Sequence, residues 1–108
     1  MAPEKPIKRR GLKALVQRLV GEGRLTISRH ARDEMKDDDV TQVEILRVLK
    51  LGKREAQKDK LEGSEYRYAF RGWDAANERW IRVIVGVPPD DVAVVVVTVI
   101  NLSGKGRT

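Results

Sequence analysis

The chain has 108 residues, 41% of them hydrophobic, so it can bury one modest core and does not have the composition of a disordered segment. It contains no cysteine, which excludes disulfides, thiolate nucleophiles and cysteine-ligated zinc. No apolar run reaches membrane-spanning length, and the first ten residues lack the apolar stretch of a secretory signal. We therefore expect a single cytoplasmic domain, residues 1–108, with no membrane partner.

The formal net charge of +6 is unevenly distributed along the chain. Residues 1–36 hold ten Lys and Arg against four Asp and Glu, whereas residues 37–65 hold six against eight. A clustered basic surface attracts polyanions, and nucleic acid is the commonest of these in the cytoplasm. The alternative is a charge excess that only keeps the protein in solution. The sequence leaves the oligomeric state open.

Apolar residues at helical spacing predict a first helix over residues 11–20, after a basic arm at residues 1–10, and Gly21 to Gly23 should end it. Residues 25–27 read as an extended link. Ser28 is a good N-cap for a second, short helix that continues to about Lys36.

A turn is expected at residues 37–39, before a third helix. Thr41 and Glu44 form a capping-box pattern that opens this helix, and Gly52 stands where a C-terminal glycine is typical.

The hydrophobic period then changes from helical to alternating. Strands are predicted near residues 53–56, over 66–71, over 79–87 and over 92–100, the last of them apolar on both faces and central. Residues 72–78 should form a loop, and residues 101–108 a flexible tail. Helices followed by an antiparallel meander give an α+β class, with the N-terminal helices packed on one face of a small sheet.

Several spaced motifs resemble a bacterial family of small uncharacterised domains, over about residues 12–100. They are an S-x-H-A-x-x-x-M opening, a second helix that ends in glycine and a V-V-V-T-V strand, found here as Ser28–Ala31 with Met35, Val40-Thr41 with Glu44 and Gly52, and residues 94–99. This family resembles the RelE-like and MqsR-like ribonuclease toxins of the barnase–EndoU–colicin–RelE fold group. The resemblance implies their α+β fold.

His30 is the only histidine of the chain. At the start of the second helix it should pair at i,i+4 with Glu34, as Arg29 should with Asp33. The helix N-terminus favours anions, so Ser28, Arg29 and Arg32 are candidate phosphate ligands. Imidazole exchanges protons near neutral pH, which suits a general acid or base. The alternative is a buried neutral histidine that only fixes the helix.

Alternation along the strands places Arg67 and Arg71 on one side, away from Tyr68. Trp80 and Arg82 share a side on the next strand. If that side is open, it offers cations and an aromatic platform, which suit single-stranded RNA. The alternative is ordinary alternation with solvated arginines.

Two further polar residues are weaker candidates. Thr98 lies in an apolar strand and either bonds a neighbouring backbone group or points at a phosphate, and Lys105 in the basic tail could touch RNA. Residues 37–39 are acidic, but no second carboxylate cluster at ligand spacing accompanies them, so we expect no metal and no other cofactor.

The resemblance implies a metal-independent endoribonuclease, an mRNA interferase-like toxin of a toxin–antitoxin system. The RNA 2′-OH would attack the adjacent phosphate, with His30 as general acid or base and Arg67 and Arg82 on the phosphate. Tyr68 is a weaker candidate for proton transfer. The partners would be RNA and a cognate antitoxin, often a small zinc-finger protein. The alternative is a non-catalytic RNA-binding or protein-interaction module on the same fold.

Overall fold

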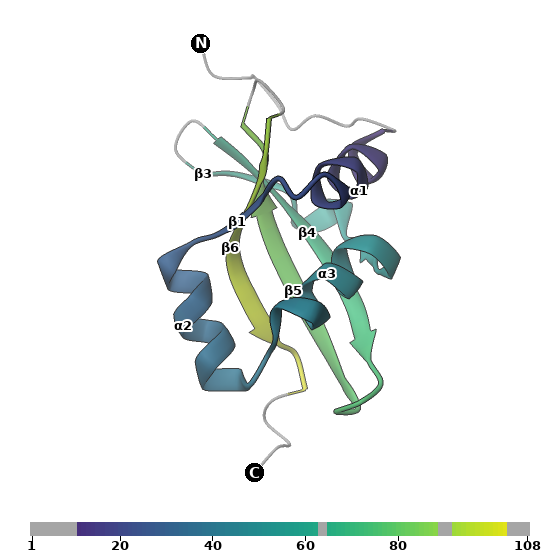
Figure 1. Cartoon of the computed structure of the whole chain (residues 1–108), viewed down its shortest axis with the longest axis vertical. Helices are drawn as coiled ribbons and strands as arrows, with labels where there is room; N and C mark the ends of the chain where they lie inside the picture. The colour runs from purple at the N-terminus through teal and green to yellow at the C-terminus, as the bar shows by residue number, and fades with distance from the viewer. Residues whose placement is uncertain (1–10, 63–64, 89–91, 104–108) are drawn as a thin grey trace.

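The computed structural model describes residues 11–62, 65–88 and 92–103, and their elements form an α+β fold, as expected (Figure 1). The elements in chain order are α1 (Leu12–Gly21), β1 (Leu25–Ile27), α2 (Arg29–Asp38), α3 (Gln42–Leu51), β2 (Lys53–Arg54), the 3-10 helix η1 (Ala56–Lys58), β3 (Lys60–Glu62), β4 (Glu65–Asp74), β5 (Arg79–Gly86) and β6 (Val94–Asn101). The basic arm at residues 1–10 and Lys105 lie outside the described residues.

The sheet is mixed, with the strand order β1-β6-β5-β4-β2 and β3 paired to β4 on the same side as β2. β4, β5 and β6 form the expected antiparallel meander. β1 runs parallel to β6, with Leu25 opposite Val94, although the sequence predicted only an extended link there. Three residues are too few to show an alternation, and the pairing partner lies about 70 residues further on.

The helix starts agree with the sequence. The Ser28 side chain accepts a hydrogen bond from the Ala31 amide, and Thr41 and Glu44 make both bonds of the capping box. Asp37 and Asp38 belong to α2 and not to the expected turn, because the helix continues to a left-handed Asp39.

Gly52 does not end α3 in the left-handed conformation of a typical C-terminal glycine, since its φ is −77°. A Cβ at this position would lie 2.5 Å from the carbonyl oxygens of Val48 and Arg71. Glycine is therefore required by the close approach of the helix end to β4, and not by backbone conformation.

β4 is longer than predicted and continues to Asp74, so the turn to β5 spans only residues 75–78. Trp73 lies opposite Trp80, and Asp74 opposite Arg79. The sequence suggested a loop from Gly72, but this glycine lies within the strand, where a Cβ would come 3.0 Å from the Val48 side chain. Asn101 likewise belongs to β6 and not to a tail.

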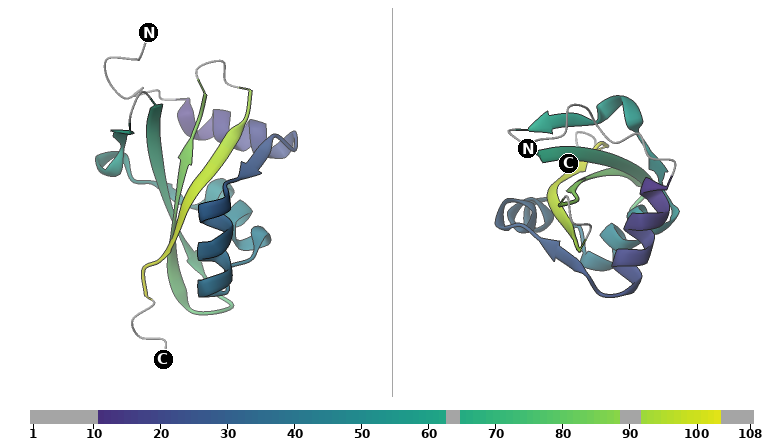
Figure 2. Two further views of the ribbon diagram at one scale, coloured as in Figure 1. Left: turned by 90° about the vertical axis from the view of Figure 1, so that its left-hand side faces the viewer. Right: turned by 90° about the horizontal axis from the view of Figure 1, so that it is seen from above.

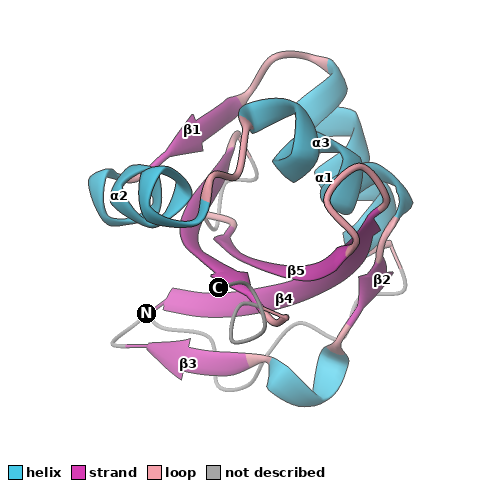
Figure 3. Cartoon of the chain, turned by 90° about the horizontal axis from the view of Figure 1, so that it is seen from below, coloured by secondary structure: helices cyan, strands magenta, loops and turns pink. Residues whose placement is uncertain are grey.

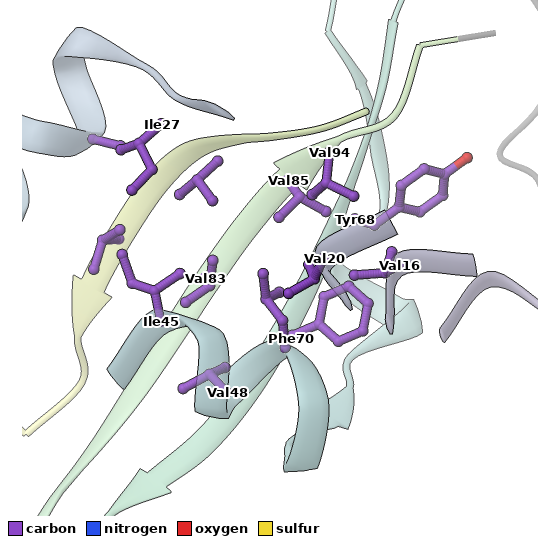
Figure 4. Close-up of a cluster of buried hydrophobic side chains, with 14 of the residues drawn as sticks. Val16, Val20, Ile27, Ile45, Val48, Tyr68, Phe70, Val83, Val85 and Val94 are labelled. Atoms are coloured by element: carbon purple, nitrogen blue, oxygen red, sulfur yellow. The ribbon is translucent and has the colours of Figure 1, made fainter. Parts of the chain in front are cut away.

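α1 and α3 cover one face of the sheet and enclose the core. Figure 4 shows Phe70, Val83 and Val85 of the sheet pointing toward Val16 and Ile45 of the helices. α2 lies alongside β6 at the other edge of the sheet (Figure 2). Burial of these apolar side chains is the main driving force for the fold. In the described part of the chain, no helix has the length and hydropathy that a membrane crossing requires.

The opposite face of the sheet is not fully open. η1 and β3 curl onto this side, away from the three helices (Figure 3). Glu55, in the same segment, donates its amide to the Ala69 carbonyl and is itself buried. As a result, Arg67 and Arg82 on this face are partly covered, whereas Arg71 and the two tryptophans stay exposed.

Candidate nucleic-acid interface

The face of the sheet opposite the helices is called the second face below. Its exposed end carries the two tryptophans of the chain side by side. Trp73 and Trp80 are directly opposite each other on β4 and β5, and their rings meet edge to face with centroids 5.2 Å apart. Their exposed fractions are 47% and 41%. The Arg71 guanidinium lies over the Trp80 ring at 4.9 Å, a cation–π contact. Large apolar rings left this accessible indicate a binding surface.

A pocket of about 320 Å³ adjoins these rings, between α3 and the outer edge of β4. β2 pairs with β4 only at Phe70 and Arg71, so no described strand continues along β4 beside Trp73. The volume is near the lower limit of small-ligand sites, roughly 300 to 1,000 Å³. The pocket is lined by Glu44, Arg47, Val48, Leu51, Gly52, Lys53, Arg71, Gly72, Trp73, Asp74 and Trp80.

The rim of the pocket is basic. Arg47, Lys53 and Arg71 stand around it, and none of them forms an ion pair with another described residue. Leu51 adds an apolar wall whose side chain is 76% exposed. The pocket thus combines flat aromatic and aliphatic walls with unpaired cations, as a site for a planar group beside a phosphate requires.

Its two carboxylates are already paired. Asp74 Oδ2 accepts from Arg79 Nε and from Asn77 Nδ2, both at 2.9 Å, and Glu44 lies 3.4 Å from Arg79. Burial acts to raise the pKa of Asp74, but the hydrogen bonds from Asn77 and Arg79 outweigh it and hold that pKa below its ordinary value. Both carboxylates therefore line the pocket as partners of Arg79 and Asn77.

The other predicted strand arginines have acidic partners. Arg82 donates to Glu55 through two hydrogen bonds of 2.6 and 3.1 Å, and Arg67 lies 3.2 Å from Glu65. The bond from Arg82 lowers the pKa of Glu55, and the bond to Glu55 raises the pKa of Arg82. Alternation predicted the face of these arginines correctly, but it did not predict the partners that neutralise them.

His30 lies on the surface of α2 and not in the core. Its side chain is 69% exposed, and Nε2 stands 3.2 Å from Glu34, which confirms the predicted i,i+4 pair. Arg29 and Asp33, by contrast, form no ion pair within the described residues. The polar contact of His30 is with Glu34, and the structure does not bring the imidazole into contact with Arg67 or Arg82.

The remaining predicted residues are spread over the fold. Arg29 and Arg32 are exposed on α2, and the Ser28 hydroxyl is used as the N-cap. Thr98 lies opposite Ile84 on β6, half-buried and outside the pocket. Tyr68 is 2% exposed on the face that the helices cover. Of all these candidates, Arg71 and Trp80 are the two that line the pocket.

Sequence reasoning missed Trp73, Arg47 and Lys53. Trp73 was assigned to a loop, although it continues the alternation of Arg67, Ala69 and Arg71 and could have been found by extending that strand. Arg47 and Lys53 come to the pocket only through the packing of α3 on β4, which no local pattern shows. Among the described residues, no group of three or more Asp, Glu or His side chains could hold a metal ion.

Comparison with protein families gives one result. Residues 27–101 match the model of a domain of unknown function, DUF4258. The chain belongs to this family. The matched region runs from the end of β1 to the end of β6, so it includes every residue of the pocket and the His30–Glu34 pair. No match was found among curated proteins or solved structures. Membership of the DUF4258 family fits an uncharacterised domain family and gives no support for a relationship to RelE or MqsR.

Proposed function

We propose that this DUF4258 domain binds single-stranded RNA, with the pocket between α3 and β4 as its main contact. The observation that carries the proposal is the Arg71–Trp80–Trp73 cluster, exposed and continuous with the pocket. Unstacked bases pack on such rings, and nearby cations hold the phosphates. The net charge of +6 favours the same partner, and an RNA partner points to the cytoplasm.

The pocket suits a single strand better than a duplex. In a nucleic-acid duplex the bases are stacked on each other and cannot pack against the tryptophan rings. In a single strand the bases can unstack and reach the pocket between α3 and β4. Arg47, Lys53 and Arg71 lie around the opening, where a backbone entering or leaving the pocket would pass. Because phosphate contacts of this kind release counterions, affinity should fall as salt is added.

Intrinsic fluorescence provides the test, since both tryptophans of the chain line the pocket. We expect a short single-stranded RNA of mixed sequence to change this fluorescence and to bind more weakly at higher salt. Trp73→Ala should reduce the affinity by between about fivefold and a hundredfold, the range found for lost base stacking. Fluorescence anisotropy of labelled RNA would measure the affinity independently.

Arg71→Ala should weaken binding and reduce its salt dependence. The matched control is Lys36→Ala, which removes the same charge from an exposed position of α2 outside the pocket lining. If the two charge variants lower the affinity equally, the binding is non-specific and the pocket is not the site. Circular dichroism should show that each variant keeps its fold.

A second candidate is the endoribonuclease activity of an mRNA interferase-like toxin, related to RelE and MqsR and held inactive by an antitoxin. The observation that favours it is the exposed His30 ring beside Glu34. A carboxylate that orients an accessible imidazole is a common arrangement for proton transfer. For cleavage, an RNA held by the arginines of the sheet, or by Arg29 and Arg32 on α2, would have to extend as far as His30.

Incubation of the protein with RNA in the presence of a chelator tests this activity. Cleavage should yield a cyclic phosphate and a 5′-OH, and His30→Ala should abolish it without change in RNA affinity. Binding without cleavage would leave the RNA-binding module as the function and remove the toxin proposal.

A further inference from the structure

The third helix, α3, carries more apolar residues than its buried side holds. Six of its ten residues are apolar, and three of these are buried in the core: Ile45, Val48 and Leu49. The helical repeat places the other three on the opposite, outer side of the helix. They are Val43, Leu46 and Leu51, and the first and last of them are 62% and 76% exposed. Large apolar side chains gathered on one exposed side of a helix indicate a surface for a partner.

Two cations lie among these outer apolar side chains. Arg47 and Lys50 are exposed on the same side of α3, and neither forms an ion pair with another described residue. Glu44, the acidic residue of α3, already accepts a hydrogen bond from Asn77 and lies 3.4 Å from Arg79. A hollow of about 290 Å³ lies against the outer stripe, which consists of Val43, Leu46, Arg47, Lys50 and Leu51.

The chemistry of the outer stripe favours an acidic protein segment. RNA phosphates could bond Arg47 and Lys50, but they would leave Val43 and Leu46 against a polar backbone. A second copy of the chain, packed face to face, would bring the same cations together and add its own net charge of +6. A partner helix with one apolar side and flanking carboxylates satisfies both kinds of group.

We propose that the outer stripe docks an amphipathic, acidic helix of a partner protein. The apolar side chains of this helix enter the hollow, and its carboxylates pair with Arg47 and Lys50. A helix fits better than an extended strand, because the side chains of the outer stripe offer no row of backbone groups to which a strand could bond. This docking does not depend on RNA binding, since Val43, Leu46 and Lys50 line this hollow and not the RNA pocket.

A synthetic helix provides the probe for the full chain. It carries leucines along one side, glutamates on both flanks and alanines elsewhere. One control peptide has lysine in place of every glutamate, and a second has the same composition as the probe in scrambled order. Fluorescence anisotropy of the labelled peptides measures the affinity, and the amide chemical shifts of the protein locate the contact. We expect the glutamate helix to bind about tenfold more tightly than either control, or better, and to shift the amides of α3 most.

Substitutions on the outer stripe assign the binding to it. Val43→Glu should weaken binding of the glutamate helix by about tenfold or more, because an apolar contact is lost and a like charge is introduced. Position 43 lies in the first turn of α3, where the helix dipole favours an acidic side chain, so the fold should be kept. Leu61→Glu makes the same exchange at a 46% exposed position of β3 and should leave the affinity unchanged. Lys50→Glu should reduce the preference for the glutamate helix over the lysine helix.

Equal affinity for the three peptides, or an equal loss in Val43→Glu and Leu61→Glu, would overturn the docking surface and leave RNA binding standing. Sedimentation and vesicle binding test the other occupants. A dimer of the free protein that Val43→Glu dissociates would assign the outer stripe to a second copy, and attachment to anionic vesicles without peptide binding would assign it to a membrane surface. Either result would overturn the proposal. Failure of RNA to bind, with the glutamate helix still bound, would remove the proposed function and leave the docking surface standing.

Discussion

Individual residues on the second face show how partners decide what a charged side chain can do. Arg71 and Arg82 are directly opposite each other on β4 and β5, yet Arg71 stacks on Trp80 whereas Arg82 is bonded to Glu55. Glu55 lies 27 residues before Arg82, at the end of a short strand predicted near residues 53–56, and nothing in that local pattern pairs it with Arg82. Alternation therefore gave the direction of both arginines, and only the path of residues 55–62 decided that one of them is neutralised.

The Glu55–Arg82 pair makes stability depend on pH. The hydrogen bond from Arg82 holds the pKa of Glu55 below its ordinary value, so the ionised carboxylate stabilises the fold above a pH of about 4.3, its unfolded pKa. That contribution is lost as the pH falls through the lower pKa of the folded state. Glu55→Gln should therefore be less stable than the parent protein near neutral pH, and the difference should shrink on acidification.

Urea denaturation at a series of pH values would measure this difference in the free energy of unfolding. A difference that stays constant down to a pH of about 3 would show that Glu55 does not contribute through its charge. Glu62→Gln, at an exposed position of β3, is the matched control and should show little pH-dependent change.

Among the elements, α2 has a role that its composition did not suggest. β1 pairs with β6 only over Val94–Val96, and beyond that point the edge of β6 is covered by α2 and by no described strand. Glu34 Oε1 accepts the Val99 amide at 2.8 Å, so a helix side chain takes the place of a strand carbonyl. The same carboxylate lies beside His30, so the edge of the sheet and the candidate catalytic histidine share one acceptor.

Glu34→Ala should lower the free energy of unfolding by about 1.5 to 3 kcal/mol, because it leaves the Val99 amide without its charged acceptor. Glu34→Gln keeps an acceptor oxygen and should cost less. Chemical denaturation gives the free energies, and hydrogen exchange should show faster exchange of the Val99 amide in the alanine variant only.

His30→Ala is the control, since exposed ion pairs contribute roughly 1 kcal/mol or less. A loss of stability in His30→Ala as large as that in Glu34→Ala would contradict the assignment of the main contribution to the bond with β6.

In the whole molecule, Arg79 joins the helical layer to the β4–β5 hairpin. Its two terminal nitrogens donate to the carbonyls of Asp38 and Asp39, at 2.6 and 2.8 Å, and its Nε donates to Asp74. The Arg79 side chain is buried, and so is its partner Asp74. This network fixes the end of α2 against the hairpin that carries Trp73 and Trp80, so the pocket depends on it.

Arg79→Ala should destabilise the protein by about 3 to 5 kcal/mol, because it leaves a buried carboxylate and two carbonyls without their donor. That is a large part of the roughly 5 to 15 kcal/mol that stabilises a small domain. Arg79→Lys should be intermediate, since one ammonium group cannot reproduce the geometry of the guanidinium. Thermal denaturation would rank the three proteins, and equal melting temperatures would contradict the role of this network.

The sequence by itself determined the three helices, the N-caps of α2 and α3, the antiparallel meander, the α+β class and the faces on which Arg71 and Trp80 lie. Each of these follows from periodicity or from bonds between residues a few positions apart. The tertiary structure alone decided the parallel pairing of β1, the cover over Arg67 and Arg82, and the pocket that joins Arg47 and Lys53 to the tryptophans. These depend on contacts between residues far apart in the chain, which chain folding brings together and which leave no local pattern in the sequence.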